Sequence, residues 1–120
     1  MSPRSRMGEL EQAVLDVLWD LDEPASGRTV HERLSDRDLA YTTVMTVLDR
    51  LVAKDIVVRE RDGRAFRYAP RRTRAAMTAD LMRDALDGTR SDREQALVSF
   101  VGEASAEDLA ALRRALADLG

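Results

Sequence analysis

The chain has no cysteine, a single histidine and no apolar run long enough to cross a bilayer. Without cysteine there is no disulfide framework and no thiolate metal site, which is typical of the reducing cytosol. A membrane helix needs a run of about 18 apolar residues, and the first seven residues lack the apolar core of a secretion signal. The sequence therefore predicts a cytoplasmic protein without stable membrane association.

The sequence also lacks the motifs of common catalytic sites. His31-Glu32 matches the start of a zinc-protease motif, but the second histidine would fall at position 35, which is Ser35. There is no glycine-rich phosphate loop and no Gly-x-Ser-x-Gly turn. We therefore expect no enzyme, no metal site and no cofactor, and a structural role for His31.

Positive charge is scarce overall but concentrated in one part of the chain. The 120 residues carry a net charge of −3. Residues 37–72 hold nine Lys and Arg against five acids, whereas residues 1–36 hold four against eight and residues 73–120 six against nine. A chain polarised in this way can present one positive face to phosphate. From composition alone, an unevenly charged solvated surface fits equally well.

The first half of the chain predicts three helices and a hairpin. Apolar residues recur at helical spacing in residues 8–21, 27–34 and 41–54, and the third helix buries Val44, Val47, Leu48 and Leu51. Ser26 is expected to cap the second helix. The period then changes to that of strands at 56–61 and 65–69. An Asp62-Gly63 pair between them is a strong hairpin signal.

After Pro70 the composition favours helices, which we expect at 74–87, 92–103 and 106–119. Gly88 is predicted to end the first. Ser91 with Glu94 and Ser105 with Asp108 form capping-box patterns at the starts of the other two.

This order predicts a mainly α protein with a small β-hairpin wing. Residues 1–72 would form a winged helix-turn-helix domain, and residues 73–120 a helical dimerisation domain. In such a domain the third helix enters the major groove of DNA and the hairpin lies along the backbone. We expect double-stranded operator DNA to be contacted by Thr42, Thr43, Met45, Thr46, Arg50, Lys54, Arg59, Arg61, Arg64 and Arg67.

Chemistry divides the roles of these residues. Threonines can donate or accept at base edges, and Arg50 can reach a guanine edge or settle on a phosphate. Lys54 and the hairpin arginines would mostly neutralise phosphate, which gives affinity without sequence information. Arg67 has a structural alternative, an ion pair with Glu60 across the hairpin.

The apolar stripe of the last three helices has two interpretations: it folds back on the first domain, or it pairs two chains. Three short helices bury little alone, which favours a homodimer on a palindromic site. The predicted interface residues are Met77, Leu81, Leu97, Phe100, Val101, Leu109, Leu112 and Leu116. A winged-helix protein-interaction module without DNA binding is the alternative function.

Three segments resemble the penicillinase-repressor (BlaI/MecI) family: MGELE at 7–11, AYTTVMTVL at 40–48 and RAFRYAP at 64–70. The resemblance spans nearly the whole chain and implies a dimeric winged-helix repressor. It also implies a membrane sensor-protease pathway in which cleavage within the dimerisation segment inactivates the repressor. The matching bond here is Ser99–Phe100, where Ser99 replaces the family's Asn. The copper-responsive relatives use C-terminal cysteines, which this chain does not have.

Overall fold

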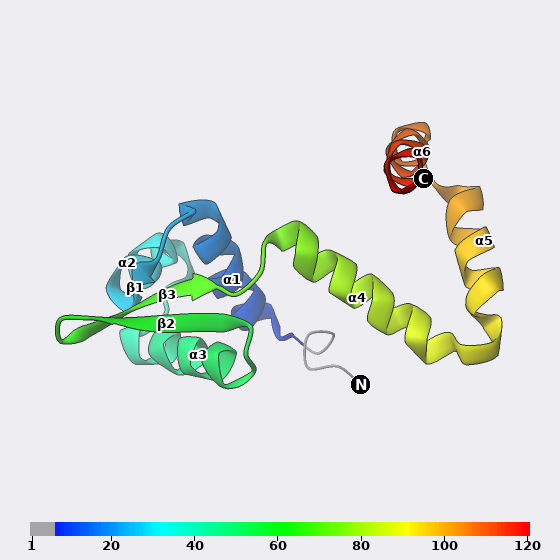
Figure 1. Ribbon diagram of the computed structural model, residues 1–120. Helices are drawn as coiled ribbons and strands as arrows, with labels where there is room; N and C mark the ends of the chain where they lie inside the picture. Colours follow the sequence, from blue (N-terminus) through cyan, green and yellow to red (C-terminus); the bar gives the residue numbers. More distant parts are fainter. Residues whose placement is uncertain (1–6) are drawn as a thin grey trace. The chain divides into compact units, whose positions relative to one another are not determined.

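The computed structural model describes residues 7–120 (Figure 1). The expectation about a secretion signal concerns the first seven residues, of which residues 1–6 lie outside this description. The chain divides into two compact units, one ending at Leu81 and one comprising residues 82–120. The division falls later than residue 72, where the sequence suggested a domain boundary.

The first unit contains three α-helices, a small sheet and the beginning of a fourth helix. In chain order its elements are α1 (Glu9–Leu21), β1 (Ala25–Ser26), α2 (Gly27–Arg33), the 3₁₀ turn η2 (Ser35–Arg37), α3 (Tyr41–Ala53), β2 (Val57–Asp62), β3 (Ala65–Pro70) and α4 (Arg74–Thr89). The mainly α architecture with a β-hairpin is confirmed.

Local chemistry explains where two of these helices begin. The Glu11 carboxylate turns back to accept a hydrogen bond from the Gly8 backbone N–H at 3.1 Å, one turn before it. The Ser26 hydroxyl accepts from the Thr29 backbone N–H at 3.2 Å and caps α2, as the sequence predicted.

The sheet is antiparallel, with strand order β1-β3-β2. Strand β1 was not predicted, because two residues carry no recognisable period. The hairpin pairs Asp62 with Ala65, so only Gly63 and Arg64 form its turn. Gly63 has φ +66°, a conformation that glycine adopts without a Cβ penalty. In Figure 1 the hairpin loop extends well beyond the helices that pack against its base.

One hydrophobic core holds the first unit together. Its fully buried side chains come from α1, α2, α3 and the sheet, and include Val14, Leu15, Leu18, Val30, Val44, Leu48, Leu51, Val57 and Tyr68. The α3 stripe is buried as predicted. Met77 also belongs to this core and is 6% exposed. Its prediction as a dimer-interface residue is therefore wrong, because the first turns of α4 pack within the first unit.

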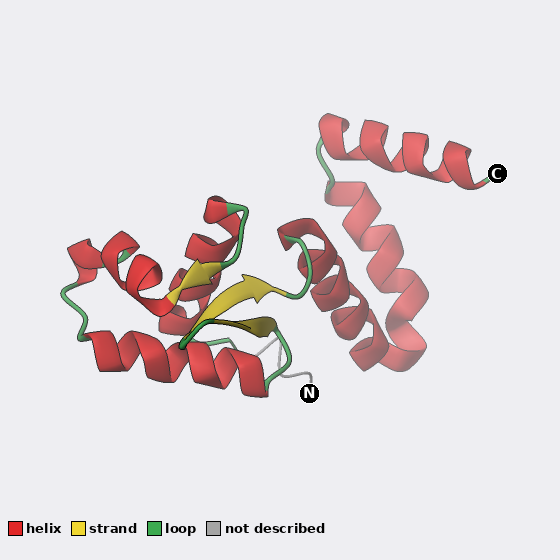
Figure 2. Ribbon diagram, turned by 60° about the vertical axis from the view of Figure 1, so that its left-hand side comes forward, coloured by secondary structure: helices red, strands yellow, loops and turns green. Residues whose placement is uncertain are grey.

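The second unit contains only helices, as the colouring of Figure 2 makes plain. It holds the end of α4, the 3₁₀ turn η3 (Arg90–Asp92), α5 (Arg93–Glu103) and α6 (Ala106–Leu119). Gly88 does not end α4. The helix continues to Thr89 and ends before Arg90, whose φ of 54° is not helical.

The two predicted capping boxes of this unit have different outcomes. Asp92 rather than Ser91 stands at the start of α5, and it makes no side-chain cap. The 3₁₀ turn occupies the residues that the Ser91 cap would need. At α6 the Ser105 hydroxyl accepts from the Asp108 backbone N–H at 3.0 Å, which confirms the second cap.

Candidate nucleic-acid interface

Burial of one side of α3 directs the other side to solvent. Val44, Val47, Leu48 and Leu51 face the core. Because a helix places residues three and four apart on one face, the opposite face is left with Thr42, Thr46, Asp49 and Arg50, which are all exposed, and with Thr43 and Met45, which are half-buried.

The threonines of this face differ in what they can offer to a base. The Thr46 hydroxyl donates to the Thr42 carbonyl oxygen at 2.9 Å, the local bond that threonine often makes in a helix. Its proton is thereby used, which leaves its lone pairs and its methyl group for a partner. No hydrogen bond to the described residues engages the Thr42 or Thr43 hydroxyl, so either can donate or accept.

Met45 has a packing role that the sequence did not reveal. A Cβ placed on Gly27, at the start of α2, would lie 2.3 Å from the Met45 sulfur. The absence of a Cβ on Gly27 thus lets the Met45 side chain lie directly against the start of α2. The signal in the sequence was Gly27 itself, directly after the Ser26 cap.

Lys54 was predicted to neutralise phosphate, but the structure gives it another partner. Its ammonium group lies 2.8 and 3.0 Å from the two Glu11 carboxylate oxygens. Burial alone would raise the pKa of Glu11, but the hydrogen bonds from Lys54 and the Gly8 backbone outweigh it and lower the pKa. The pair joins the end of α3 to the start of α1. Lys54 therefore positions α3 and is withdrawn from the predicted phosphate contacts.

The hairpin carries arginines arranged around one aromatic ring. The Arg59 guanidinium lies 4.4 Å from the centre of the Phe66 ring, and that of Arg61 lies 5.4 Å from it. Phe66 stands directly opposite Arg61 in the register. Because the ring face attracts cations, Phe66 gathers both charges on one side of the hairpin. No pattern in the sequence predicts this role of Phe66, which follows only once the register of the strands is known.

Arg67 forms an ion pair within the hairpin, as the alternative interpretation expected, but with Asp62 and not with Glu60. Glu60 faces it in the register, yet its guanidinium pairs with Asp62 at 2.6 Å, a diagonal neighbour within reach of a long side chain. The hydrogen bond and the charge of Asp62 raise the pKa of Arg67. Arg67 is thus less available for phosphate than Arg61 and Arg64, which make no ion pair with residues 7–120.

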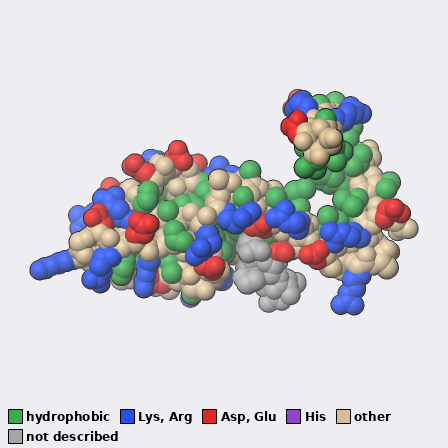
Figure 3. Space-filling view, in the orientation of Figure 1, with side chains coloured by type: hydrophobic (Ala, Val, Ile, Leu, Met, Phe, Trp, Pro, Cys, Tyr) green, Lys and Arg blue, Asp and Glu red, His purple; other side chains and the backbone are tan. Residues whose placement is uncertain are grey.

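The α3 face and the hairpin are brought together at one cleft. Asp49 of α3 lies 3.8 Å from Arg59 of the hairpin. The start of α2, the start of α3 and the hairpin also line one cleft of about 460 Å³, with Arg28, Tyr41 and Arg64 among its lining residues. Figure 3 shows Lys and Arg side chains projecting from the end of the molecule where the hairpin loop lies. The first unit therefore presents its positive charge beside the threonine face of α3.

His31 has the structural role that we expected. Its Nε2 atom lies 2.7 Å from the Leu39 carbonyl oxygen, and its ring meets Tyr41 edge-on at 5.8 Å between centres. These contacts hold the turn between α2 and α3.

No helix within residues 7–120 is both long enough and apolar enough to span a membrane.

The second unit leaves many apolar side chains exposed. The predicted interface residues Leu97, Phe100, Val101, Leu112 and Leu116 are exposed, and Leu109 is half-buried. Several of them line an almost wholly apolar hollow of about 340 Å³ between the end of α4, α5 and α6. Ser99 and Phe100, which flank the predicted cleavage bond, lie exposed in the middle of α5.

The first unit has three helices, the third of which exposes a polar face, and a basic hairpin follows them. This arrangement defines a winged-helix DNA-binding protein. Comparison with known proteins agrees. Residues 7–118 match the model of the penicillinase repressor family, and the chain belongs to that family.

Two kinds of relatives support this assignment. The chain is 52% identical over 122 residues to the transcriptional regulator BlaI of Mycobacterium tuberculosis, covering 99% of this chain and 88% of that protein. The solution structure of the DNA-binding domain of the repressor BlaI matches 62% of this chain and 90% of its own length, with 25% identity and a TM-score of 0.53.

A third comparison concerns the fold alone. The complex structure of hsRosR-S1 covers 92% of this chain and 99% of its own, with 23% identity and a TM-score of 0.56. The predicted family, its winged-helix fold and its class of DNA-binding transcriptional repressor are confirmed.

Proposed function

We propose that this repressor binds a palindromic operator as a homodimer, with one α3 in the major groove of each half-site. The observation that carries the proposal is the contact between Asp49 and Arg59 at 3.8 Å, which brings the exposed face of α3 beside the arginine hairpin within the first unit. The α3 helix and the hairpin can contact the same DNA duplex only if they lie on the same side of the first unit. In a two-fold dimer the half-site centres stand about 34–36 Å apart, or at a multiple of that distance.

Within each half-site, the side chains divide into those that select bases and those that hold the backbone. Arg50, Thr42 and Thr46 are exposed on α3 and contact base edges. Arg61 and Arg64, free of ion pairs with the described residues, contact phosphate and supply affinity on any sequence. Arg59 belongs to neither set, because its guanidinium group contacts both the Phe66 ring and the Asp49 carboxylate.

Dimerisation follows from the exposed apolar side chains of α5 and α6. A second copy of the chain covers Leu97, Phe100 and Leu112 and doubles the number of base contacts. Cleavage of the Ser99–Phe100 bond by a sensor-protease pathway would divide this apolar set and release the operator. Because the bond lies within a helix, the protease acts on a locally unfolded α5.

A salt titration separates this function from that of a winged-helix module that binds only proteins. The full chain is titrated against the DNA upstream of its own gene and against a shuffled duplex, by fluorescence anisotropy at several salt concentrations. Neutralised phosphates predict that log affinity falls linearly with log salt, with a slope of about −0.9 per contact. Tighter binding to the upstream DNA supports the repressor. Absent or salt-insensitive binding supports the protein-interaction module instead.

A further inference from the structure

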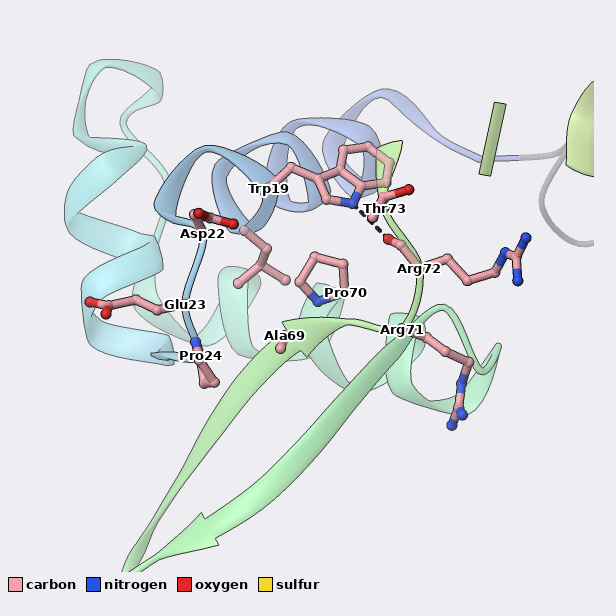
Figure 4. A pocket seen from close by; sticks show the side chains of 10 residues that line it. Trp19, Asp22, Glu23, Pro24, Ala69, Pro70, Arg71, Arg72 and Thr73 are labelled. Atoms are coloured by element: carbon pink, nitrogen blue, oxygen red, sulfur yellow. Dashed lines mark hydrogen bonds between the residues drawn. The ribbon is translucent and has the colours of Figure 1, made fainter. Parts of the chain in front are cut away.

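The first unit contains a cavity of about 300 Å³ that the DNA interface does not use (Figure 4). It lies between the end of α1, the segment leading to β1 and the segment leaving β3. Its apolar wall is formed by Leu18, Trp19, Pro24, Ala69 and Pro70. The volume is at the lower end of the range of small-molecule sites.

The indole of Trp19 is held in place at this cavity. Its ring N–H donates to the Arg72 carbonyl oxygen at 2.9 Å, the hydrogen bond drawn in Figure 4. The Arg74 guanidinium lies 5.0 Å from the centre of the same ring and pairs with Asp20 at 3.4 Å. A ligand would therefore meet a fixed aromatic surface and would not have to order it first.

The unpaired charge at the rim of the cavity is negative. Arg71 and Arg72 line it, but their guanidinium groups pair with Asp55 at 2.6 Å and with Asp80 at 2.8 Å, and both side chains point away from the cavity in Figure 4. Asp22 lies at the rim, exposed, and forms no hydrogen bond or ion pair with residues 7–120. It therefore offers a carboxylate without a protein partner among these residues, beside the apolar wall.

We propose that this cavity binds a small organic cation with a flat apolar body, such as an aromatic primary amine. The apolar body would lie against Trp19 and Pro70, and the ammonium group would pair with the Asp22 carboxylate. A neutral or anionic molecule of the same shape would gain the apolar contact without the ion pair. An occupant would also touch the chain that leads from the hairpin into α4, since Ala69, Pro70 and Thr73 line the site.

The chain provides its own probe, because Trp19 is its only tryptophan. The ¹⁵N-labelled full-length protein, without DNA, gives a single indole N–H cross-peak. We expect phenethylammonium to shift this cross-peak saturably. Neutral 2-phenylethanol should bind at least about threefold more weakly, as expected for the loss of one exposed ion pair, and 3-phenylpropionate more weakly still. The absence of a saturable shift, or equal affinity for all three probes, would overturn the proposal. Shifts confined to the apolar hollow of residues 82–112 would do so too.

A matched pair of variants tests the role of Asp22. Its backbone is left-handed, with φ 57°, a conformation that asparagine tolerates, so Asp22→Asn removes the charge without straining the chain. We expect phenethylammonium to bind about threefold to fivefold more weakly to this variant. Asp38→Asn is the control, because Asp38 has φ 53° and does not line the cavity. Equal affinity in the Asp22 variant and the parent, or equal losses in both variants, would contradict the assignment.

Discussion

Residues 7–81 bury fourteen apolar side chains in one core, whereas no residue between 82 and 120 is buried. The second unit is nevertheless rich in apolar side chains, among them Val98 and Leu116, which are 67% and 66% exposed. Helices of this length are marginal in water unless an amphipathic face is packed. The first unit can therefore fold on its own contacts, whereas the helices of the second need a further apolar surface to cover them, the role that we propose for a second copy of the chain.

The comparison also separates two functions. The charged and polar side chains that we propose for DNA contact are in the unit with its own core. The exposed apolar side chains are in the other unit, where contact with a second copy would link two DNA-binding units. The predictions below test this division, from the largest expected effect to the smallest.

The strongest test removes the proposed partner surface. Leu112→Asp combined with Leu116→Asp places two charges on the apolar side of α6, and we expect sedimentation to give the mass of one chain. Operator affinity should then fall by at least about a hundredfold, because two linked half-site contacts become independent. The control, Leu112→Met with Leu116→Met, conserves volume and should keep the dimer. An intact dimer in the aspartate variant would refute the placement of the interface.

A pair of leucine truncations compares the two units directly. Leu48→Ala leaves a cavity in the first core and should lower the free energy of unfolding by about 2–5 kcal/mol, followed by Trp19 fluorescence. Leu97→Ala, at a residue 44% exposed in the single chain, should change that transition by less than about 1 kcal/mol and instead weaken self-association. Equal losses in the Trp19 transition would mean that the units share one core.

Much of the first unit was predictable because its signals are local. The α3 stripe has the helical period, and the Asp62-Gly63 pair places the hairpin turn within one residue. The capping residues Ser26 and Ser105 act on their own helices, and both were predicted correctly. These features depend on neighbours within a few positions in the chain.

The failures involve partners that are distant in sequence. Lys54 pairs with Glu11, 43 positions earlier, and nothing near Lys54 signals this contact. The helical spacing of apolar residues around Met77 indicated that its side chain is buried, but not whether a second chain or the first unit covers it. Asp49, which no pattern singled out, meets Arg59 only because the hairpin folds back beside α3. Tertiary structure decides each of these, and local pattern cannot.

Two arginines test the division of labour within the first unit. Arg50→Ala should cost about 1–3 kcal/mol on the operator and less on shuffled DNA, because a base contact is lost. Arg64→Ala should weaken both duplexes equally and reduce the salt slope by about 1, the signature of one phosphate. Arg113→Ala, exposed in α6, controls for loss of charge alone. If the Arg50 and Arg64 variants had the same ratio of operator affinity to shuffled-DNA affinity, the assignment of roles would be contradicted.

The smallest effect concerns the contact that positions α3. Glu11→Gln keeps the shape of the side chain but removes the charge that faces Lys54. Glu11 is 8% exposed, whereas the Lys54 side chain is 31% exposed and partly screened. We therefore expect a loss of about 1–2 kcal/mol at neutral pH. Glu9→Gln is the control, because Glu9 pairs with Arg37 in solvent and should lose less than about 0.5 kcal/mol.

The pH dependence of the Glu11 variant distinguishes an ion pair from mere packing. The pKa of Glu11 is lowered below its usual value of 4.5 in the folded chain. Its contribution is therefore complete above that pH and is lost as the pH falls through the folded pKa. The stability gap between the parent and Glu11→Gln should accordingly be widest near neutral pH and shrink below pH 4.5, as followed by urea unfolding. A gap that does not shrink at any acidic pH at which the parent still folds would contradict a contribution from the Glu11 charge.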